Sequence, residues 1–188
     1  KAGVTWDMSC GYGGRLLGAI AADVNYIGTD PCTKTFEGLE QIKEDWGSKN
    51  KTIELYKVGS EDFWPPYCEV DLCFTSPPYF DWEKYSEEDT QSYKKYPTTK
   101  EWIDGFLLNT IDRCHYGLKP GGILVLNVAN TKRIKNFEEE TLKLARMLHF
   151  KHIDTWYLHL SSQKGIPKRE PIFIFKKMTQ MFPRTKLV

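Results

Sequence analysis

The run Thr75–Phe80 constrains the fold of this chain more than any other stretch of its sequence. It follows Val70–Phe74, a short and mostly apolar segment that predicts a buried strand. A proline cannot donate to a strand ladder and is not tolerated inside a helix, so Pro77 and Pro78 must take the chain out of the sheet. Loops at the carboxyl ends of parallel strands bind ligands in open α/β sheets, and we therefore expect a binding site here.

The side chains around the two prolines supply a hydroxyl group and a flat ring. The sequence Ser76-Pro77-Pro78-Tyr79 resembles the catalytic motif of the S-adenosylmethionine (SAM)-dependent DNA amino-methyltransferases, which methylate N6 of adenine or N4 of cytosine. The resemblance implies that Ser76 Oγ and the Pro77 carbonyl accept hydrogen bonds from the amino group of the target base. It also implies that Tyr79 stacks on that base after it has been flipped out of the DNA duplex.

A glycine-rich turn lies between a predicted strand and a predicted helix near the start of the chain. The strand is Val4–Asp7, and residues 15–21 have a helical pattern. The glycine spacing differs from G-x-G-x-x-G and is similar to the D-x-x-x-G-x-G loop that binds the methionine part of SAM in these methyltransferases. By this resemblance four residues would hold the amino-acid end of SAM: Asp7, Cys10, Gly11 and Gly13.

A second predicted strand, residues 25–30, ends in an acid. Asp30 lies 23 residues after Asp7, close to the spacing of about 20 residues expected for a ribose-binding carboxylate. Its two oxygens can accept hydrogen bonds from both ribose hydroxyls, while Pro31 would lie on the adenine face. The alternative is that Asp30 caps the helix predicted at 33–46.

A third predicted strand, residues 52–58, leads into two further acids, Glu61 and Asp62. In the enzymes that the chain resembles, an acidic residue at this place binds the adenine amino group of SAM. The sequence does not decide between Glu61 and Asp62, and a solvated loop is the alternative for either residue.

The remaining pattern completes an α/β fold. Predicted helices at 101–118, capped by Thr98 or Thr99, and at 136–150 alternate with predicted strands at 123–128, 152–160 and 171–176. Residues 62–69 contain two prolines and are too short for a helix. We therefore predict a Rossmann-like class I methyltransferase: a seven-stranded, mostly parallel sheet whose last two strands form an antiparallel hairpin. The resemblance implies the strand order 3-2-1-4-5-7-6.

The polar stretch at 81–99 has no clean periodicity, and loops of this length inside a domain are usually functional. We expect a mobile substrate loop over the target base. The alternative is a lid with ordinary surface aromatics. Mixed aromatic residues and lysines suit contact with nucleic acid. The residues concerned are Trp82, Lys84, Tyr85, Gln91, Tyr93, Lys94, Lys95 and Tyr96.

Composition limits the remaining possibilities. The 188 residues suit a single domain, 1–188, and the net charge of +1 leaves room only for local basic faces, at 132–135 or 164–169, which are alternatively plain surface. The sequence has no apolar run long enough to span a membrane, and we expect no signal peptide. Five cysteines form no C-x-x-C pair, which indicates buried thiols in a reducing cytoplasm, and we expect no metal site.

These features together predict a SAM-dependent enzyme that methylates an exocyclic amino nitrogen of a DNA base, N4 of cytosine or N6 of adenine. A restriction-modification role is one expectation. Two alternatives remain: a SAM-dependent methyltransferase acting on RNA or another amino group, and a catalytically degenerate module that binds nucleic acid. The sequence leaves the target base, the recognition sequence and the oligomeric state open.

Overall fold

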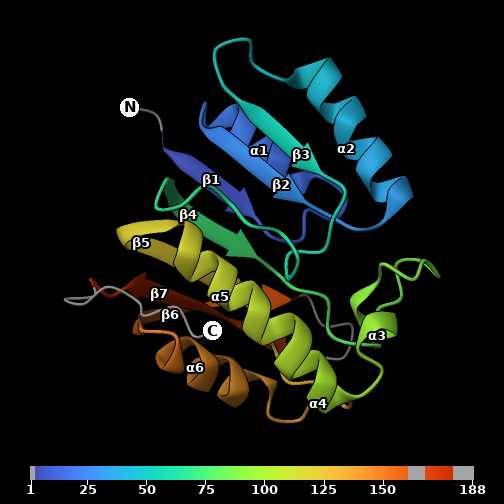
Figure 1. The fold of residues 1–188 in the computed structure, drawn as a ribbon, viewed down its shortest axis with the longest axis vertical. Helices are drawn as coiled ribbons and strands as arrows, with labels where there is room; N and C mark the ends of the chain where they lie inside the picture. Colours follow the sequence, from blue (N-terminus) through green and yellow to red (C-terminus); the bar gives the residue numbers. More distant parts are fainter. Residues whose placement is uncertain (1–2, 161–167, 180–188) are drawn as a thin grey trace, which may run out of the picture.

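The computed structural model of the chain describes residues 3–160 and 168–179, which form a seven-stranded sheet between helices (Figure 1). The strand order, β3-β2-β1-β4-β5-β7-β6, confirms the prediction. The strands are β1 (Val4–Asp7), β2 (Asn25–Thr29), β3 (Ile53–Tyr56), β4 (Val70–Thr75), β5 (Leu118–Asn127), β6 (Phe150–Leu160) and β7 (Lys168–Lys177). The helices are α1 (Gly14–Ala21), α2 (Thr33–Trp46), α3 (Ser92–Lys95), α4 (Thr99–Trp102), the π-helical turn η1 (Ile103–Leu107), α5 (Leu108–Gly117) and α6 (Phe137–Met147).

The chain winds outward in two directions from the centre of the sheet. From β1 it proceeds to β2 and β3, and from β4 it proceeds the other way to β5 and β6, with β7 inserted antiparallel between those two. Because crossovers between parallel strands are right-handed, the reversal places α1 and α2 on one face of the sheet and α5 and α6 on the other. Figure 1 shows α5 crossing one face of the sheet beside α6.

The direction of winding reverses between β1 and β4. These strands pair in parallel with Asp7 opposite Phe74, so the loops that follow them leave the sheet side by side. Such a switch point is where open α/β sheets form their ligand crevices. The tertiary structure therefore brings the glycine turn and the Thr75–Phe80 run to one place.

Each face of the sheet has its own packed core. On the α5 and α6 face, Trp102 and Phe137 are fully buried, with their ring centroids 5.6 Å apart. On the other face, Leu16 from α1 and Leu39 from α2 belong to a smaller cluster. Complete burial of such side chains stabilises the fold by roughly 1.5–3 kcal/mol each, which fixes the helices that frame the switch point.

The long helix after the 81–99 segment begins where its sequence indicates. Thr98 is the cap: its hydroxyl accepts from the Glu101 amide at 3.2 Å, while the Glu101 carboxylate accepts from the Thr98 amide at 3.1 Å. This reciprocal pair satisfies two amides that have no partner within the helix. A π-helical turn, η1, then separates α4 from α5.

Several element bounds differ from the sequence-based expectations. β5 begins at Leu118, so the run Lys119–Gly122 is already part of the strand, which was expected to begin at residue 123. Gly121 has a φ of +79°, and the pairing of β5 with β4 shifts register nearby. Pairing with β7 likewise extends β6 back to Phe150. Hydrogen bonding between neighbouring strands sets where β5 and β6 begin, and the local sequence pattern contains no information about that bonding.

The 81–99 segment, which shows no clean periodicity in the sequence, contains the short helix α3. Within the described residues no helix joins β3 to β4, as expected from the two prolines there. None of the helices in the described part of the chain is long and apolar enough to cross a membrane. The basic run at 164–169 lies largely outside the described residues.

Candidate active site

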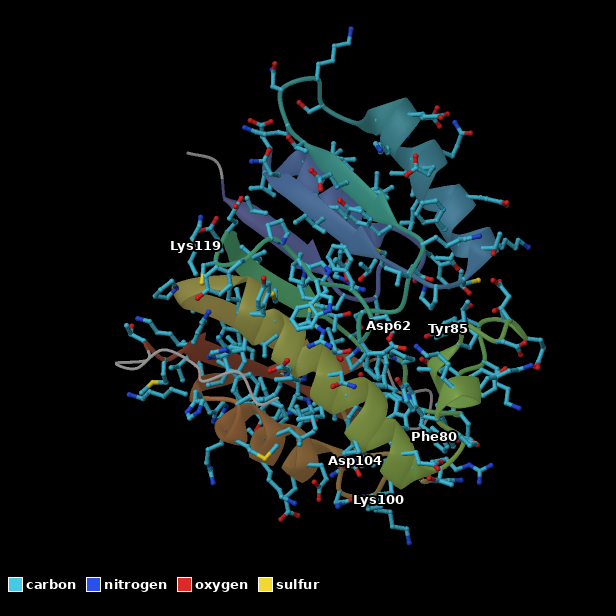
Figure 2. The ribbon with its side chains drawn as sticks, viewed as in Figure 1. Asp62, Phe80, Tyr85, Lys100, Asp104 and Lys119 are labelled. Atoms are coloured by element: carbon cyan, nitrogen blue, oxygen red, sulfur yellow. The ribbon has the colours of Figure 1, made fainter. Side chains whose placement is uncertain are left out.

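A cavity of about 580 Å³ opens at the switch point, within the range of about 300–1,000 Å³ usual for small-molecule sites. In Figure 2, Asp62, Phe80 and Tyr85 lie around this end of the sheet, whereas Lys119 lies at the opposite end. Nine of the predicted site residues line the cavity: Cys10, Gly11, Asp30, Pro31, Glu61, Ser76, Pro77, Pro78 and Tyr79. The other three, Asp7, Gly13 and Asp62, are not among the lining residues.

The glycine turn has the backbone conformation that its sequence requires. Gly11 and Gly13 have φ values of +54° and +83°, in the left-handed region that side chains with a Cβ disfavour. A Cβ at Gly13 would also lie 2.5 Å from Ile42 Cδ1. Gly13 thus allows the tight turn that leads into α1, of which it is the N-cap residue, while Gly11 lines the cavity.

Asp7 organises the turn from beneath the cavity. Its buried carboxylate accepts from Arg15 Nε at 2.8 Å, from the Tyr26 hydroxyl at 2.9 Å and from the Ser9 amide at 3.3 Å. Arg15 also donates to the Ser9 carbonyl and lines the cavity, so the ion pair holds a guanidinium at the wall. Arg15 was missed from the sequence; its place in the first turn of the helix after a glycine loop was the available signal.

Cys10 contributes its backbone and a neutral thiol. Its amide donates to the Thr29 carbonyl at 3.1 Å, and its sulfur lies 3.3 Å from the Tyr26 hydroxyl oxygen. Burial raises the pKa of the Cys10 thiol well above its usual value, and the nearby Asp7 charge adds to the shift. Cys10 is therefore held as a thiol that packs against β2 and is not activated as a nucleophile.

Asp30 ties the strand end to the glycine turn. Its Oδ2 accepts from the Gly11 amide and its Oδ1 from the Cys32 amide, each at 3.0 Å. Burial raises the pKa of the Asp30 carboxyl, and these two hydrogen bonds oppose the shift. Asp30 is not the N-cap residue of α2; that position is Cys32, which makes no side-chain cap. The amide of the next residue is bound by Glu88 from the 81–99 segment.

Glu61 and Asp62 differ sharply in their surroundings. Glu61 is 2% exposed and lines the cavity, whereas Asp62 lies outside it with an exposed side chain. Lys95 pairs with both acids, binding Glu61 through Oε1. Glu61 Oε2 is buried and has no hydrogen-bond partner among the described residues. Burial raises the pKa of the Glu61 carboxyl, and Lys95 opposes the shift.

The turn after β4 packs the ring and the hydroxyl of Tyr79 against neighbouring side chains. Tyr79 is 9% exposed; its hydroxyl donates to Asn127 Oδ1 at 3.4 Å, and its ring meets Phe137 edge-on at 5.7 Å. Phe80 adopts a φ of +56°, which turns the chain sharply after the motif. Burial raises the pKa of Tyr79 to about 12, with a hydrogen bond from Ser76 acting against the shift. Asn127, at the end of β5, was not found from the sequence.

The 81–99 segment forms one wall of the cavity through Glu83, Tyr85, Thr90, Gln91 and Ser92. Two of its three lysines are committed to ion pairs within the protein: Lys94 with Glu87 at 2.9 Å, and Lys95 as described above. Trp82 and Tyr85 are exposed, whereas Tyr93 and Tyr96 pack against the core.

Solved structures share this architecture. A SAM-dependent methyltransferase from Methanosarcina mazei superposes with a TM-score of 0.63 at 12% identity, over 95% of this chain and 94% of that chain. The 1,6-didemethyltoxoflavin-N1-methyltransferase of Burkholderia thailandensis, solved with S-adenosylhomocysteine, gives 0.64 at 11% identity, over 95% and 72%. The N-methyltransferase NodS of Bradyrhizobium japonicum WM9 gives 0.67 at 12% identity, over 94% and 86%. The fold is thus that of the Rossmann-like class I methyltransferases.

The family follows from the sequence of the second half. A family model described as DNA methylase, for N6 and N4 methyltransferases, matches residues 70–186, and the chain belongs to this family. No curated protein matches the chain in a sequence comparison. Because members of the family use SAM, the protein is a SAM-dependent methyltransferase with SAM as its cofactor.

The residues at the cavity wall fit this cofactor chemically. SAM has an ammonium group, a carboxylate, two ribose hydroxyls and an adenine amino group. The wall has a guanidinium at Arg15 and two buried carboxylates at Asp30 and Glu61, and the Oε2 atom of Glu61 has no partner among the described residues. A buried acceptor without a donor is costly, so this atom indicates a donor-bearing ligand.

Proposed function

We propose that this protein transfers the methyl group of SAM to an exocyclic amino nitrogen of a DNA base, N6 of adenine or N4 of cytosine. The observation that carries the proposal is that Ser76 and Tyr79 line the same cavity as Gly11, Asp30 and Glu61. A turn suited to an amino-bearing heterocycle thus faces the groups suited to SAM.

The cofactor half of the cavity would be used as follows. Asp30 has further lone pairs for the ribose hydroxyls, and Pro31 offers an apolar face to adenine. Glu61, rather than Asp62, would accept from the adenine amino group through Oε2. The Gly11 backbone and Arg15 would receive the amino-acid end, with Asp7 holding Arg15 in place.

The target amino group needs activation because its lone pair is delocalised into the aromatic ring. Ser76 Oγ and the Pro77 carbonyl would accept its two N–H groups and favour a tetrahedral nitrogen whose lone pair points along the transfer direction. SAM, when bound, supplies an electrophilic methyl group. Positioning of this kind can contribute on the order of 7–11 kcal/mol to lowering a barrier.

No strong base is needed before the transfer, because the nitrogen loses its proton readily once it is methylated. Tyr79 is suited to stacking rather than to proton transfer, since its pKa of about 12 keeps the phenol protonated at neutral pH. A flipped base costs a few kcal/mol to extrude, and stacking on an aromatic ring returns roughly 1–3 kcal/mol. The ring would thus stabilise the extruded base.

The test is mass spectrometry of nucleosides from DNA and from RNA, each incubated with protein and SAM. N6-methyladenine or N4-methylcytosine in the DNA sample is the expected product, and its identity reveals the target base. Ser76→Ala should reduce the product while leaving the affinity for S-adenosylhomocysteine unchanged. Methylation of RNA alone, or of neither polymer by a protein that binds the cofactor, would contradict the proposal.

A further inference from the structure

Gln91 is a buried amide that the contacts within the protein leave incomplete. The residue is 6% exposed and lines the cavity, and its Nε2 has no hydrogen-bond partner within the described part of the chain. It is the N-cap residue of α3, yet its side chain makes no cap hydrogen bond. An unsatisfied buried donor is costly, so a structural role does not account for it.

The position of Gln91 is fixed by its neighbours on both sides. Thr90 Oγ1, one residue before it, donates to the Pro31 carbonyl at 3.1 Å. Ser92 Oγ, one residue after it, accepts from the buried Trp102 Nε1 at 3.0 Å. Because both neighbours are tied down, the backbone of Gln91 is held at the cavity wall.

Two contacts of this segment place Gln91 at the end of the cavity where the adenosine of SAM is proposed to bind. Its chain segment crosses from Pro31, which follows the proposed ribose acid, to Lys95, which pairs with the proposed adenine acid Glu61. Carboxylates there can bind the donors of adenosine, namely the amino group and the ribose hydroxyls. Adenosine also has acceptors, the ring nitrogens and ribose oxygens, and these require a donor.

We propose that Gln91 is a cofactor-recognition residue whose amide donates a hydrogen bond to an acceptor on the adenosine half of SAM. The 81–99 segment would then form part of the cofactor site and not only a cover over the target base. This inference rests on the proposed use of Asp30 and Glu61 by SAM and adds the donor that those two acids lack.

The experiment compares ligand affinities without nucleic acid. S-adenosylhomocysteine and 5′-methylthioadenosine, which lacks the amino-acid end, are titrated by calorimetry, the weaker ligand by displacement. Gln91→Leu, which has no donor, and Gln91→Glu, which keeps the shape but offers acceptors, should each bind both ligands about five- to tenfold more weakly. Gln41→Leu on the exposed side of α2 is the matched control and should bind like the wild type.

Three results would overturn the inference. Wild-type affinity in both Gln91 variants would show that the amide makes no cofactor contact. Weaker binding of S-adenosylhomocysteine alone would place the contact at the amino-acid end. If the wild type bound neither ligand, the proposed function would fail and this inference with it. Thermal unfolding identifies a variant that does not fold, in which case the other Gln91 variant decides.

Discussion

At the scale of single residues, the ring and the hydroxyl of Tyr79 have different surroundings. Tyr79 lines the cavity and its ring meets Phe137 edge-on, while its hydroxyl donates a long hydrogen bond to Asn127 and accepts one from Ser76. Tyr79→Ala should lower kcat/KM on DNA, with a rise in activation free energy that matches the lost stacking, roughly 1–3 kcal/mol. Tyr79→Phe should retain most of the activity, because it keeps the ring. Equal inactivity of the two variants in a methylation assay would assign the chemistry to the phenol.

Glu61 yields a prediction about stability and pH. Burial raises the pKa of the Glu61 carboxyl in the folded protein, so the native state binds the carboxyl proton more tightly than the unfolded state does. The stability that this proton contributes is therefore lost as the pH rises through the raised pKa. Glu61→Gln should remove this dependence. The measurement is the melting temperature of both ligand-free proteins between about pH 4 and 8. Near neutrality, the melting temperature of Glu61→Gln should match or exceed that of the wild type.

The same variant should bind S-adenosylhomocysteine more weakly, because one acceptor for the adenine amino group becomes an amide. Glu69→Gln is the control, since Glu69 is an exposed carboxylate outside the cavity lining. A variant less stable than wild type at neutral pH would mean that the Lys95 pair outweighs the cost of burying the Glu61 charge.

At the scale of elements, the 81–99 segment is attached to α2 and to the acids that follow β3. Glu88 bonds the first turn of α2 through Thr33, and Lys95 pairs with Glu61 and Asp62. Chymotrypsin cleavage after the exposed Trp82 should therefore slow when S-adenosylhomocysteine is bound. It should also be faster in ligand-free Lys95→Met than in the ligand-free wild type.

Lys100→Met is the matched control for this measurement. Its ion pair with Asp104 lies on the exposed side of the helix after the segment, as Figure 2 shows, and is of a kind that contributes little. Neither substitution removes a chymotrypsin site. Identical cleavage rates for wild type, Lys95→Met and Lys100→Met would show that the ion pair does not restrain the segment.

At the scale of the whole molecule, the ligand and the fold should be thermodynamically linked. A ligand at 100 times its Kd stabilises the native state by about 2.7 kcal/mol, which for a domain of this size corresponds to about 5–10 °C in melting temperature. S-adenosylhomocysteine should produce such a shift. NAD should not, because the glycine spacing differs from that of dinucleotide-binding loops. A shift with NAD of equal size would contradict the cofactor assignment.

Much of the fold could be predicted because its signals are local. The apolar run Val70–Phe74, the glycine turn and a helix cap at Thr98 or Thr99 each depend on a few neighbouring residues. The structure confirms the strand and the turn and identifies Thr98 as the cap. The helix α3 could not be predicted, because four residues do not form a stable helix alone. It exists through Ser92 bonded to Trp102 and Lys95 paired with Glu61.

The sequence by itself determined the seven strands and most of the helices along the chain, the two loops that meet at the cavity and the family resemblance, because periodicity, turn residues and short motifs act over a few positions. Only the tertiary structure decided that Glu61 rather than Asp62 faces the cavity, that Asp7 positions Arg15 beneath the turn, and that the 81–99 segment carries Gln91 into the site. Those outcomes depend on contacts between residues far apart in the chain. Burial and pairing at such contacts form only when the sheet brings its strand ends together.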